Sequence, residues 1–206
     1  YKPPLKRGFF FRCFLLVNWY IHTTKTLMLR TLLNNYQKHY PDEKLVIEKT
    51  LNFLNNSVDC FSRSNTSGHF TGSGWLTDKS RRWVVMTHHK KLNKWLQLGG
   101  HADGNKNLQQ VALEECIEES GLQNIEVVSS EIFDIDIHTI PQYENIPKHL
   151  HFDVRFLFEA EKDAEDIIVS KESNDVAWIK LDDVATKNNE ISILRMLEKI
   201  KNNKWA

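Results

Sequence analysis

Apolar residues recur at helical spacing near the start of the chain. They are Leu29, Leu32, Leu33 and Tyr36. Pro41 interrupts this run and can begin a second helix, because proline is tolerated in the first helical turn. That second helix has an apolar side over residues 45–54 and closes at Asn55 and Asn56. We therefore predict a helical hairpin over residues 28–57, packed on the main domain as cover for its core.

From Phe70 onward the pattern changes to short runs rich in β-branched and aromatic residues, which is typical of strands. The predicted strands are Phe70–Leu76, Trp83–Thr87, Trp95–Leu98, 124–138, 149–159, 166–169 and Val176–Ile179. One helix interrupts them and runs to about Ser120, where Gly121 is a natural C-terminal cap. An amphipathic helix over Ile191–Ile200 closes the chain. This order predicts a mixed α/β (α+β) domain.

Residues 1–27 differ in pattern from the rest of the chain. Basic residues precede an apolar run from Phe9 to Ile21, a layout similar to that of a secretory signal. Arg12 and Asn18 break the run, and it is too short to span a bilayer. We therefore expect three segments. They are an N-terminal extension without a role in the chemistry (1–27), the helical hairpin (28–59) and the main domain (60–206).

Charge and cysteine content narrow the class of protein. The 27 Lys+Arg residues balance 27 Asp+Glu residues, so no overall charge attracts the protein to nucleic acid. We expect neither nucleic acid nor a membrane as a partner, whereas a phosphorylated small molecule is compatible with this balance. Cys13, Cys60 and Cys116 form no C-x-x-C pair, which favours a reducing cytoplasm. Cys116 is expected to be a small buried residue on the helix rather than a nucleophile.

The helix that interrupts the strands carries four glutamates and, between residues 107 and 122, no lysine or arginine. The glutamates are Glu114, Glu115, Glu118 and Glu119. At about 100° per residue their side chains occupy an arc of roughly 140°. Like charges one turn apart, with Cβ atoms ~5–6 Å from each other, destabilise a helix. Mg²⁺ or Mn²⁺ would supply the missing positive charge, although a solvated acidic face explains the carboxylates alone equally well.

The loop before this helix makes a metal site the better interpretation. It reads Gly99-Gly100-His101-Ala102-Asp103-Gly104. Glycines allow the backbone to approach a ligand closely, and the start of a helix favours phosphate oxygens. Loop and carboxylates together therefore predict a site for a metal-bound phosphate group.

The same stretch resembles the Nudix signature, G-x5-E-x7-R-E-U-x-E-E-x-G-U, in which U is a bulky aliphatic residue. The residues in register are Gly100, Glu115, Glu118, Glu119, Gly121 and Leu122. Residues 60–65, 95–104 and 149–156 are similar to a bacterial Nudix subgroup with a Gly-Gly-His-Ala-Asp-Gly loop. The resemblance implies a Nudix-type α/β/α sandwich with a mixed sheet, to which the N-terminal helical hairpin is added.

Two positions depart from the signature. Lys106 stands where the first Glu is expected, and Glu114 stands where an Arg is expected. In the family that Arg helps to orient the neighbouring glutamate, which is Glu115 here. Glu114 removes this ion pair and adds repulsion, but it leaves the expected metal ligands Glu118 and Glu119 in place.

The resemblance also implies roles for the acidic residues. Glu115, Glu118 and Glu119 are expected to bind Mg²⁺ or Mn²⁺, with the carbonyl of Gly99 as a further ligand. A metal-bound water would attack phosphorus, and Glu115 would act in general base catalysis. Glu172 matches a loop position, before a late strand, from which the family supplies another carboxylate. It is predicted as a further ligand or the general base, and an ordinary exposed glutamate is the equally weighted alternative.

Histidines and one arginine are the candidate substrate contacts. His149 and His151 alternate along a predicted strand and so share a face. No third ligand is apparent in the sequence, which favours substrate contact or packing over zinc. His101 in the glycine-rich loop is predicted to contact phosphate or to support the metal ligands. Arg155 could contact phosphate, and an ion pair with Asp153 is not expected, because side chains at i and i+2 share a face without necessarily meeting.

These features predict a metal-dependent hydrolase that cleaves a phosphoanhydride bond in a nucleoside diphosphate linked to another group. A homodimer is compatible with the resemblance. The alternative is a Nudix-fold nucleotide-binding or sensor module with weakened catalysis, which the departures at Lys106 and Glu114 motivate. Isoprenoid diphosphate isomerisation fits poorly, because the catalytic cysteine segment of that family is not apparent. Resemblance at the level of the fold does not identify the substrate.

Overall fold

The computed structural model describes residues 26–202. The expected N-terminal extension therefore lies almost wholly outside the described residues. Residues 26 and 27, the last two assigned to that extension, already belong to a helix that runs to residue 39. Within residues 26–202, no helix is long and apolar enough to cross a membrane.

The predicted helical hairpin is present. The helix over residues 26–39 leads through a short 3-10 segment, Pro41–Glu43, into α2, Lys44–Asn56. The buried apolar residues that attach the hairpin to the sheet include Leu29, Leu33, Tyr36, Ile47 and Leu54. Phe53 stacks on Phe152 of the sheet, with ring centroids 3.9 Å apart. Apolar burial thus joins the hairpin to the main domain, as its amphipathic pattern predicted.

One mixed sheet of eight strands forms the centre of the domain. Its strands are β1 (Gly68–Asp78), β2 (Trp83–His89), β3 (Lys94–Leu96), β4 (Leu98–His101), β5 (Ile125–Val127), β6 (Asp134–Ile140), β7 (His149–Ala160) and β8 (Ser173–Lys180). β1 and β7 pair in parallel. The antiparallel pairs are β1 with β2 and β4, β2 with β3 and β8, and β7 with β5 and β6. The expected mixed sheet is confirmed.

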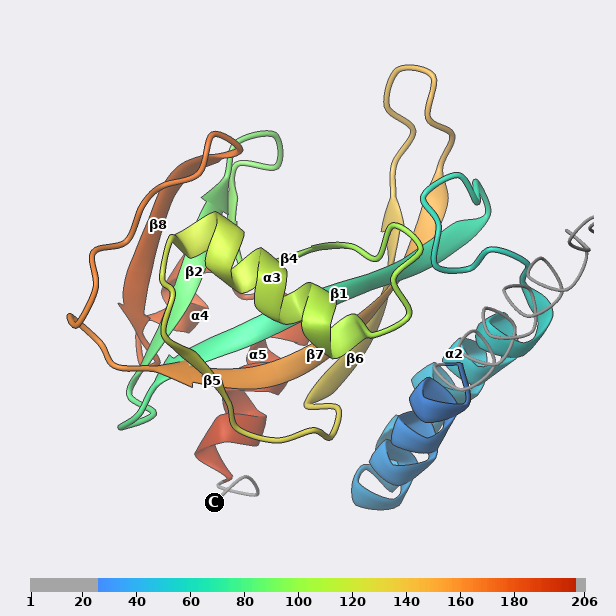
Figure 1. Cartoon of the computed structure of the whole chain (residues 1–206), viewed down its shortest axis with the longest axis horizontal. Coiled ribbons are helices and arrows are strands. Elements are labelled where there is room, and N and C mark those ends of the chain that lie inside the picture. The colour runs from blue at the N-terminus through green and yellow to red at the C-terminus, as the bar shows by residue number, and fades with distance from the viewer. Residues whose placement is uncertain (1–25, 203–206) are drawn as a thin grey trace, which may run out of the picture.

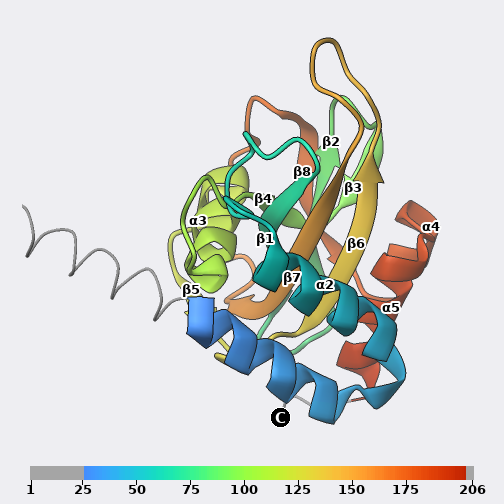
Figure 2. The ribbon, with the colours of Figure 1, turned by 90° about the vertical axis from the view of Figure 1, so that its right-hand side faces the viewer.

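Helices cover both faces of this sheet (Figures 1 and 2). α3 (Leu108–Ser120) lies on one face, where its buried residues join a core cluster with the hairpin and Phe70. α5 (Ile191–Lys201) and the short α4 (Val184–Lys187) lie on the other face, in a second cluster around Trp75. The expected α/β/α sandwich is therefore confirmed.

Three predicted strands are wrong in detail. Trp95–Leu98 spans the ends of two strands, β3 and β4, with a break at Gln97. The segment 124–138 is not one strand, because it breaks into β5 and β6 around residues 128–133. Residues 166–169 form no strand. The N–H of Ile168 donates instead to the carbonyl of Ser120 at the end of α3, over 2.8 Å. Apolar residues in this segment therefore cover the end of a helix rather than extend the sheet.

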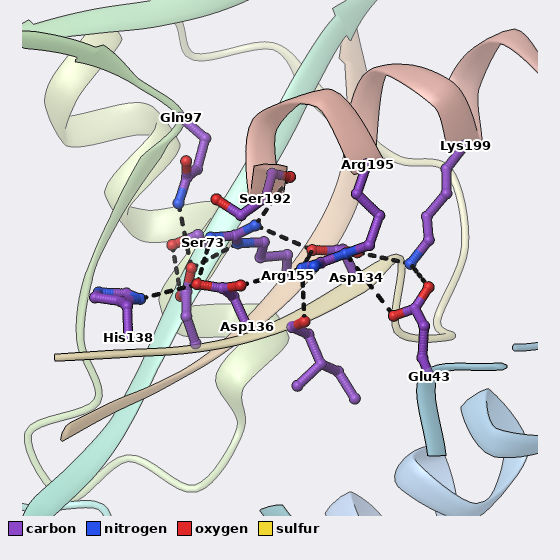
Figure 3. A network of polar contacts seen from close by, with 12 residues as sticks. Glu43, Ser73, Gln97, Asp134, Asp136, His138, Arg155, Ser192, Arg195 and Lys199 are labelled. Carbon is purple, nitrogen blue, oxygen red and sulfur yellow. Dashed lines mark hydrogen bonds and ion pairs between the residues drawn. The ribbon is translucent and has the colours of Figure 1, made fainter. Parts of the chain in front are cut away.

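A buried ion network joins the sheet to α5 (Figure 3). Asp134 of β6 is fully buried and accepts hydrogen bonds from three cations. The donors are Arg155 of β7 (3.0 Å), Arg195 of α5 (2.7 Å) and Lys199 of α5 (2.6 Å). Burial opposes ionisation of Asp134, but the hydrogen bond from Arg195 and the nearby charges lower its pKa below the ordinary value. Lys199 also pairs with Glu43 in the hairpin turn, over 2.8 Å, so the network ties hairpin, sheet and α5 together.

Replacing Asp134 with Asn keeps the shape of the side chain but removes the charge that compensates three buried cations. We expect Asp134→Asn to lower the free energy of unfolding by about 3–5 kcal/mol, the range for breaking a buried ion pair. Denaturant unfolding followed by circular dichroism measures this change. Asp182→Asn is the matched control, because its side chain is 90% exposed, and we expect a change within about 0.5 kcal/mol. Equal effects of the two substitutions would contradict the role of the network.

Candidate active site

The ends and the buried side of α3 set the direction of its carboxylates. The Asn107 side chain caps the first turn by accepting a hydrogen bond from the N–H of Gln110 (3.3 Å). Gly121 ends the helix in the left-handed conformation, with φ 78°, which glycine adopts without steric cost. Ala112 and Cys116 are fully buried, which confirms the expectation for Cys116. The glutamates therefore project from the remaining surface of the helix.

Strand β4 lies directly against two of these glutamates. The carboxylate of Glu119 accepts a hydrogen bond from the N–H of Gly99 (3.1 Å). At Gly100 an added Cβ atom would collide with the carboxylate of Glu115, so only glycine allows this close approach. The glycine-rich segment therefore contacts the helix at two points. The N–H of Gly99 donates to Glu119, and the backbone of Gly100, which has no side chain, lies against Glu115.

Burial and mutual repulsion disfavour the ionised forms of both carboxyls. Burial, followed by the charges of Glu118 and Glu172, raises the pKa of Glu115 to about 7. The pKa of Glu119 is raised to about 8, mainly by burial and further by the neighbouring carboxylates. The hydrogen bond from Gly99 lowers this pKa and so offsets part of the increase. Both groups need a nearby cation to be ionised together at neutral pH.

The donor set at this position fits a hard divalent cation. It consists of the carboxylates of Glu115 and Glu119 beside the backbone of Gly99 and Gly100. After burial, the charge of Glu118 is the next largest influence that raises the pKa of Glu115. Mg²⁺ and Mn²⁺ prefer such oxygen ligands. The charge of an ion would also relieve the repulsion that raises the pKa values of the carboxyls.

Glu172 approaches this cluster from a distant part of the chain. It immediately precedes β8, and its carbonyl accepts a hydrogen bond from the N–H of Lys90 (3.1 Å) at the end of β2. Burial is the largest cause of the raised pKa values of Glu115 and Glu119, and the charge of Glu172 is one of the smaller causes. The turn before β8 therefore brings Glu172 within electrostatic reach of the helix.

The two residues that depart from the Nudix signature have partners of their own. Glu114 is exposed and accepts a hydrogen bond from the side chain of Gln110 in the same helix (2.9 Å). Lys106 donates to the hydroxyl of Thr26 (3.2 Å), and its ammonium lies 5.4 Å from the ring centroid of Phe61. Lys106 thus attaches the hairpin to the glycine-rich loop, and Glu114 contributes to the exposed surface of α3.

Arg63 belongs to the neighbourhood of the site, although the sequence pattern did not single it out. Its guanidinium forms a bidentate pair with Asp103 of the glycine-rich loop, with Nε 2.6 Å from Oδ1. Burial is the largest influence on the pKa values of Glu115 and His101, and the charge of Arg63 lowers both. Because Arg63 is far from α3 in the sequence, no spacing in a single chain could signal this proximity.

The predicted substrate contacts His101, His149 and His151 gather in one place, and His69 of β1 joins them. The ring centroid of His69 lies 5.1 Å from that of His101, 5.0 Å from that of His149 and 4.7 Å from that of His151. Burial lowers the pKa of His101 to about 4 and that of His151 to about 3, so both rings are neutral near pH 7. The strand pairing of β1 with β7, which the sequence did not reveal, brings His69 to this group.

Arg155 lies in the ion network and not among these histidines. Its Nε donates to Asp153 (2.7 Å) and its Nη1 donates to Asp134 (3.0 Å). The expectation that Arg155 and Asp153 do not pair is therefore wrong. On a buried sheet face, neighbouring charges must compensate each other, which draws these two side chains together. The side chain of Arg155 is only 2% exposed, so its position does not support the predicted contact with a substrate phosphate.

Residues 71–200 match the model of the NUDIX domain family. The chain belongs to the Nudix family. It is accordingly a Nudix-type phosphohydrolase, a class of enzyme that hydrolyses nucleoside diphosphate derivatives. A search of curated proteins found no match to the sequence.

Solved structures resemble this Nudix protein to different degrees. The E. coli dihydroneopterin triphosphate pyrophosphohydrolase is 12% identical with a TM-score of 0.51, covering 65% of this chain and 95% of that chain. A NUDIX family hydrolase from Clostridium perfringens is 24% identical with a TM-score of 0.46, covering 65% and 97%. The NUDIX domain of Shewanella oneidensis NrtR, solved with ADP ribose, is 17% identical with a TM-score of 0.45, covering 74% and 96%. The first of these similarities supports the fold alone.

The raised pKa values make the stability of the metal-free Nudix protein depend on pH. Glutamates titrate near pH ~4.3 in an unfolded chain, whereas Glu115 and Glu119 titrate near about 7 and about 8 in the folded one. The folded protein therefore binds more protons over this interval, and the stability from these groups is lost as pH rises through it. We expect Tm in the presence of a chelator to fall as pH rises from about 5 to about 8, with a smaller fall for Glu115→Gln.

Thermal denaturation across this pH range, with and without Mg²⁺, measures the effect. Added Mg²⁺ should restore Tm most strongly at the alkaline end, where the carboxylates are ionised. Identical pH profiles for the unaltered protein and Glu115→Gln would contradict the assignment of the pH dependence to these carboxyls.

Proposed function

We propose that this protein is a Mg²⁺- or Mn²⁺-dependent hydrolase that cleaves a phosphoanhydride bond in a nucleoside diphosphate linked to another group. The observation that carries the proposal is a pair of half-buried carboxyls, Glu115 and Glu119, held against the backbone of Gly99 and Gly100 with raised pKa values. Such a pair is stabilised in its ionised form by a divalent cation, and a diphosphate can share the coordination sphere of that cation.

Glu115, Glu118 and Glu119 are the proposed metal ligands, with the carbonyl of Gly99 as a further one. The hydrogen bond from Gly99 to Glu119 supports this set, because it holds the Gly99 peptide at the carboxylate (3.1 Å). A bound ion of this kind lowers the pKa of a coordinated water and polarises phosphoryl oxygens. Glu115, Glu118 and Glu119 would hold the ion beside the glycine-rich loop.

Glu115 is the proposed general base. A glutamate beside a water held by a divalent ion would be placed to accept a proton from that water. Gly100 supports this role, because its bare backbone keeps the Glu115 carboxylate close to β4. Glu172 is proposed as a second base or a further ligand, from the turn before β8.

One side chain outside α3 is proposed to contact the substrate phosphates. His101 does not share this role, because Gly100 faces α3 and the next side chain along β4 points to the opposite face of the sheet. Arg63 has a side chain that is 60% exposed beside Asp103, so it is open to an anion from solvent. Arginine suits phosphate because its planar group can donate two parallel hydrogen bonds.

Glu115→Gln keeps the size of the side chain and removes both its charge and its ability to accept a proton. We expect kcat/KM for phosphate release to fall about 10²–10⁴-fold across a panel of nucleotides and dinucleotides with Mg²⁺ or Mn²⁺. Glu114→Gln is the matched control on the same helix, and we expect it to leave the rate unchanged. An unaltered rate in Glu115→Gln would contradict its role, and an unaltered rate in Glu172→Gln would remove Glu172 from the mechanism.

The orientation of Glu114 favours one alternative, a nucleotide-binding or sensor module with weakened catalysis. Glu114 stands at the position of the family's arginine and accepts a hydrogen bond from Gln110, so Glu115 has no arginine beside it on α3 to orient it. Arg63 supplies positive charge to Glu115 from another segment, which supports the enzyme instead. Calorimetry with the same panel separates the two: tight binding without cleavage supports the sensor, and the absence of Mg²⁺ and Mn²⁺ uptake contradicts both.

We also propose that the segment ahead of the first helix has no part in the chemistry, whereas the hairpin supports the glycine-rich loop through Lys106. A protein that begins at Thr26 is expected to retain the activity and solubility of the full chain. Phosphate release and size-exclusion chromatography of the two proteins test this, and loss of either property would contradict it.

Cys60 and Cys116 are free thiols, in keeping with the reducing cytoplasm that we propose as the compartment. A homodimer stays a prediction.

A further inference from the structure

Histidines from four strands meet on the face of the sheet opposite α3. They are His69 of β1, His101 of β4, His138 of β6, and His149 and His151 of β7. The strand register places both His69 and His138 directly opposite His151. The position of Gly72 identifies this face, because an added Cβ there would lie 2.6 Å from the carbonyl of Leu108 in α3. Successive side chains alternate along a strand, so His69 points away from α3.

Three of these rings bring nitrogen atoms together. One ring nitrogen from each of His69, His149 and His151 lies within 4.8 Å of the other two. Nε2 of His149 lies 3.3 Å from Nε2 of His151. No carboxylate belongs to this group, so it offers imidazole ligands alone.

Backbone carbonyls orient two of the rings toward the centre of this group. Nδ1 of His149 lies 2.8 Å from the carbonyl of Pro147, and Nδ1 of His69 lies 3.3 Å from the carbonyl of Asn65. A carbonyl can only accept, so each Nδ1 carries the proton and each Nε2 presents its lone pair. Metal-binding histidines are commonly held in this way, with one nitrogen donating to a carbonyl and the other free for the ion.

The free nitrogen of His69 is the least expected feature of the group. His69 is only 2% exposed, and its Nε2 is buried without a hydrogen-bond partner among residues 26–202. Buried polar atoms nearly always have a partner, because an unsatisfied one is destabilising. Simple packing therefore leaves the orientation of His69 unexplained, whereas a bound ion would satisfy this lone pair.

We propose that His69, His149 and His151 form a binding site for one transition-metal ion of the Zn²⁺ type. Zinc–nitrogen bonds of about 2.1 Å place tetrahedral ligand atoms roughly 3.4 Å apart, close to the 3.3 Å between the His149 and His151 nitrogens. All three ligand nitrogens lie within 4.8 Å of one another, so each pair has to approach by at most roughly 1.4 Å to reach this geometry. Water or His101 completes the fourth position, since the His101 ring centroid is 5.1 Å from that of His151.

This site is distinct from the carboxylate site on α3 in both position and chemistry. The histidines occupy the opposite face of the sheet, and imidazole nitrogen suits zinc better than it suits magnesium. A protein with both sites would therefore bind one ion through nitrogen and another through oxygen. An ion held by β1 and β7 would also tie together the N-terminal ends of these two parallel strands, in keeping with a structural role.

Zinc titration of the full-length protein tests the site. The protein is stripped with a chelator and titrated with Zn²⁺ by calorimetry in excess Mg²⁺. We expect one tight equivalent of Zn²⁺, and affinity at least ~100-fold weaker in His69→Gln, His149→Gln and His151→Gln, since even outer-shell changes cost 10–100-fold. His138→Gln is the matched control, because its ring lies 5.4 Å from that of His151 but it is not one of the three ligands. We expect this control to bind zinc as the unaltered protein does.

X-ray absorption at the zinc edge identifies the ligands of the ion in the unaltered protein, so this test does not depend on whether a histidine variant folds. Spectra of the unaltered protein should show three or four imidazole ligands. A spectrum with oxygen ligands only, or the absence of tight zinc binding, would overturn the proposal. A Glu115→Gln/Glu119→Gln double variant should keep its zinc equivalent, and loss of zinc there would assign the ion to α3 instead.

Discussion

Strands β1 and β7 pair in parallel along their length, from Gly68 opposite Leu150 to Asp78 opposite Ala160. Parallel neighbours cannot be joined by a tight turn, so the intervening chain must leave the pair and return. That long connection contains β4, which pairs with β1, and α3, which packs on one face of the two strands. The other face of the same pair brings the histidines and the buried charges together. Both candidate sites therefore depend on this pairing.

Charge compensation divides the domain into two kinds of polar cluster. Around Asp134 the positive and negative groups are buried together and satisfy each other, so the cluster stabilises the packing of hairpin, sheet and α5. Around Glu115 and Glu119 negative charge is in excess, and Arg63 relieves only part of it. Perturbed carboxyls next to exposed backbone are typical of functional sites rather than of structural ion pairs.

The two faces of the sheet also differ in the ligands that they present. Carboxylate oxygens gather on the face of α3, and imidazole nitrogens gather on the opposite face. Hard and borderline metal ions distinguish between such ligands. The sheet itself separates the carboxylates from the histidines, although the two groups are close in the sequence. His101, for example, directly follows Gly100, but Gly100 faces α3 and the His101 side chain points to the opposite face.

Local periodicity and spacing were sufficient to determine much of this protein. The helical hairpin, the mixed α/β class, the end of α3 at Gly121 and the arc of Glu114 to Glu119 follow from interactions within one or two turns, which a sequence records directly. The same is true of the shared face of His149 and His151. Where local signals were ambiguous, as in residues 166–169, apolar residues predicted a strand that the chain does not form.

Only the tertiary structure decided which distant residues meet. The contacts of His69 with His151, of Arg155 with Asp153 and Asp134, and of Arg63 with Asp103 come from strand register and burial. Burial likewise decided the pKa values of Glu115 and Glu119, because desolvation depends on everything packed around a group. The sequence determined the chemical groups and their local direction, whereas long-range packing determined their neighbours, since a linear chain carries no direct signal of distance in space.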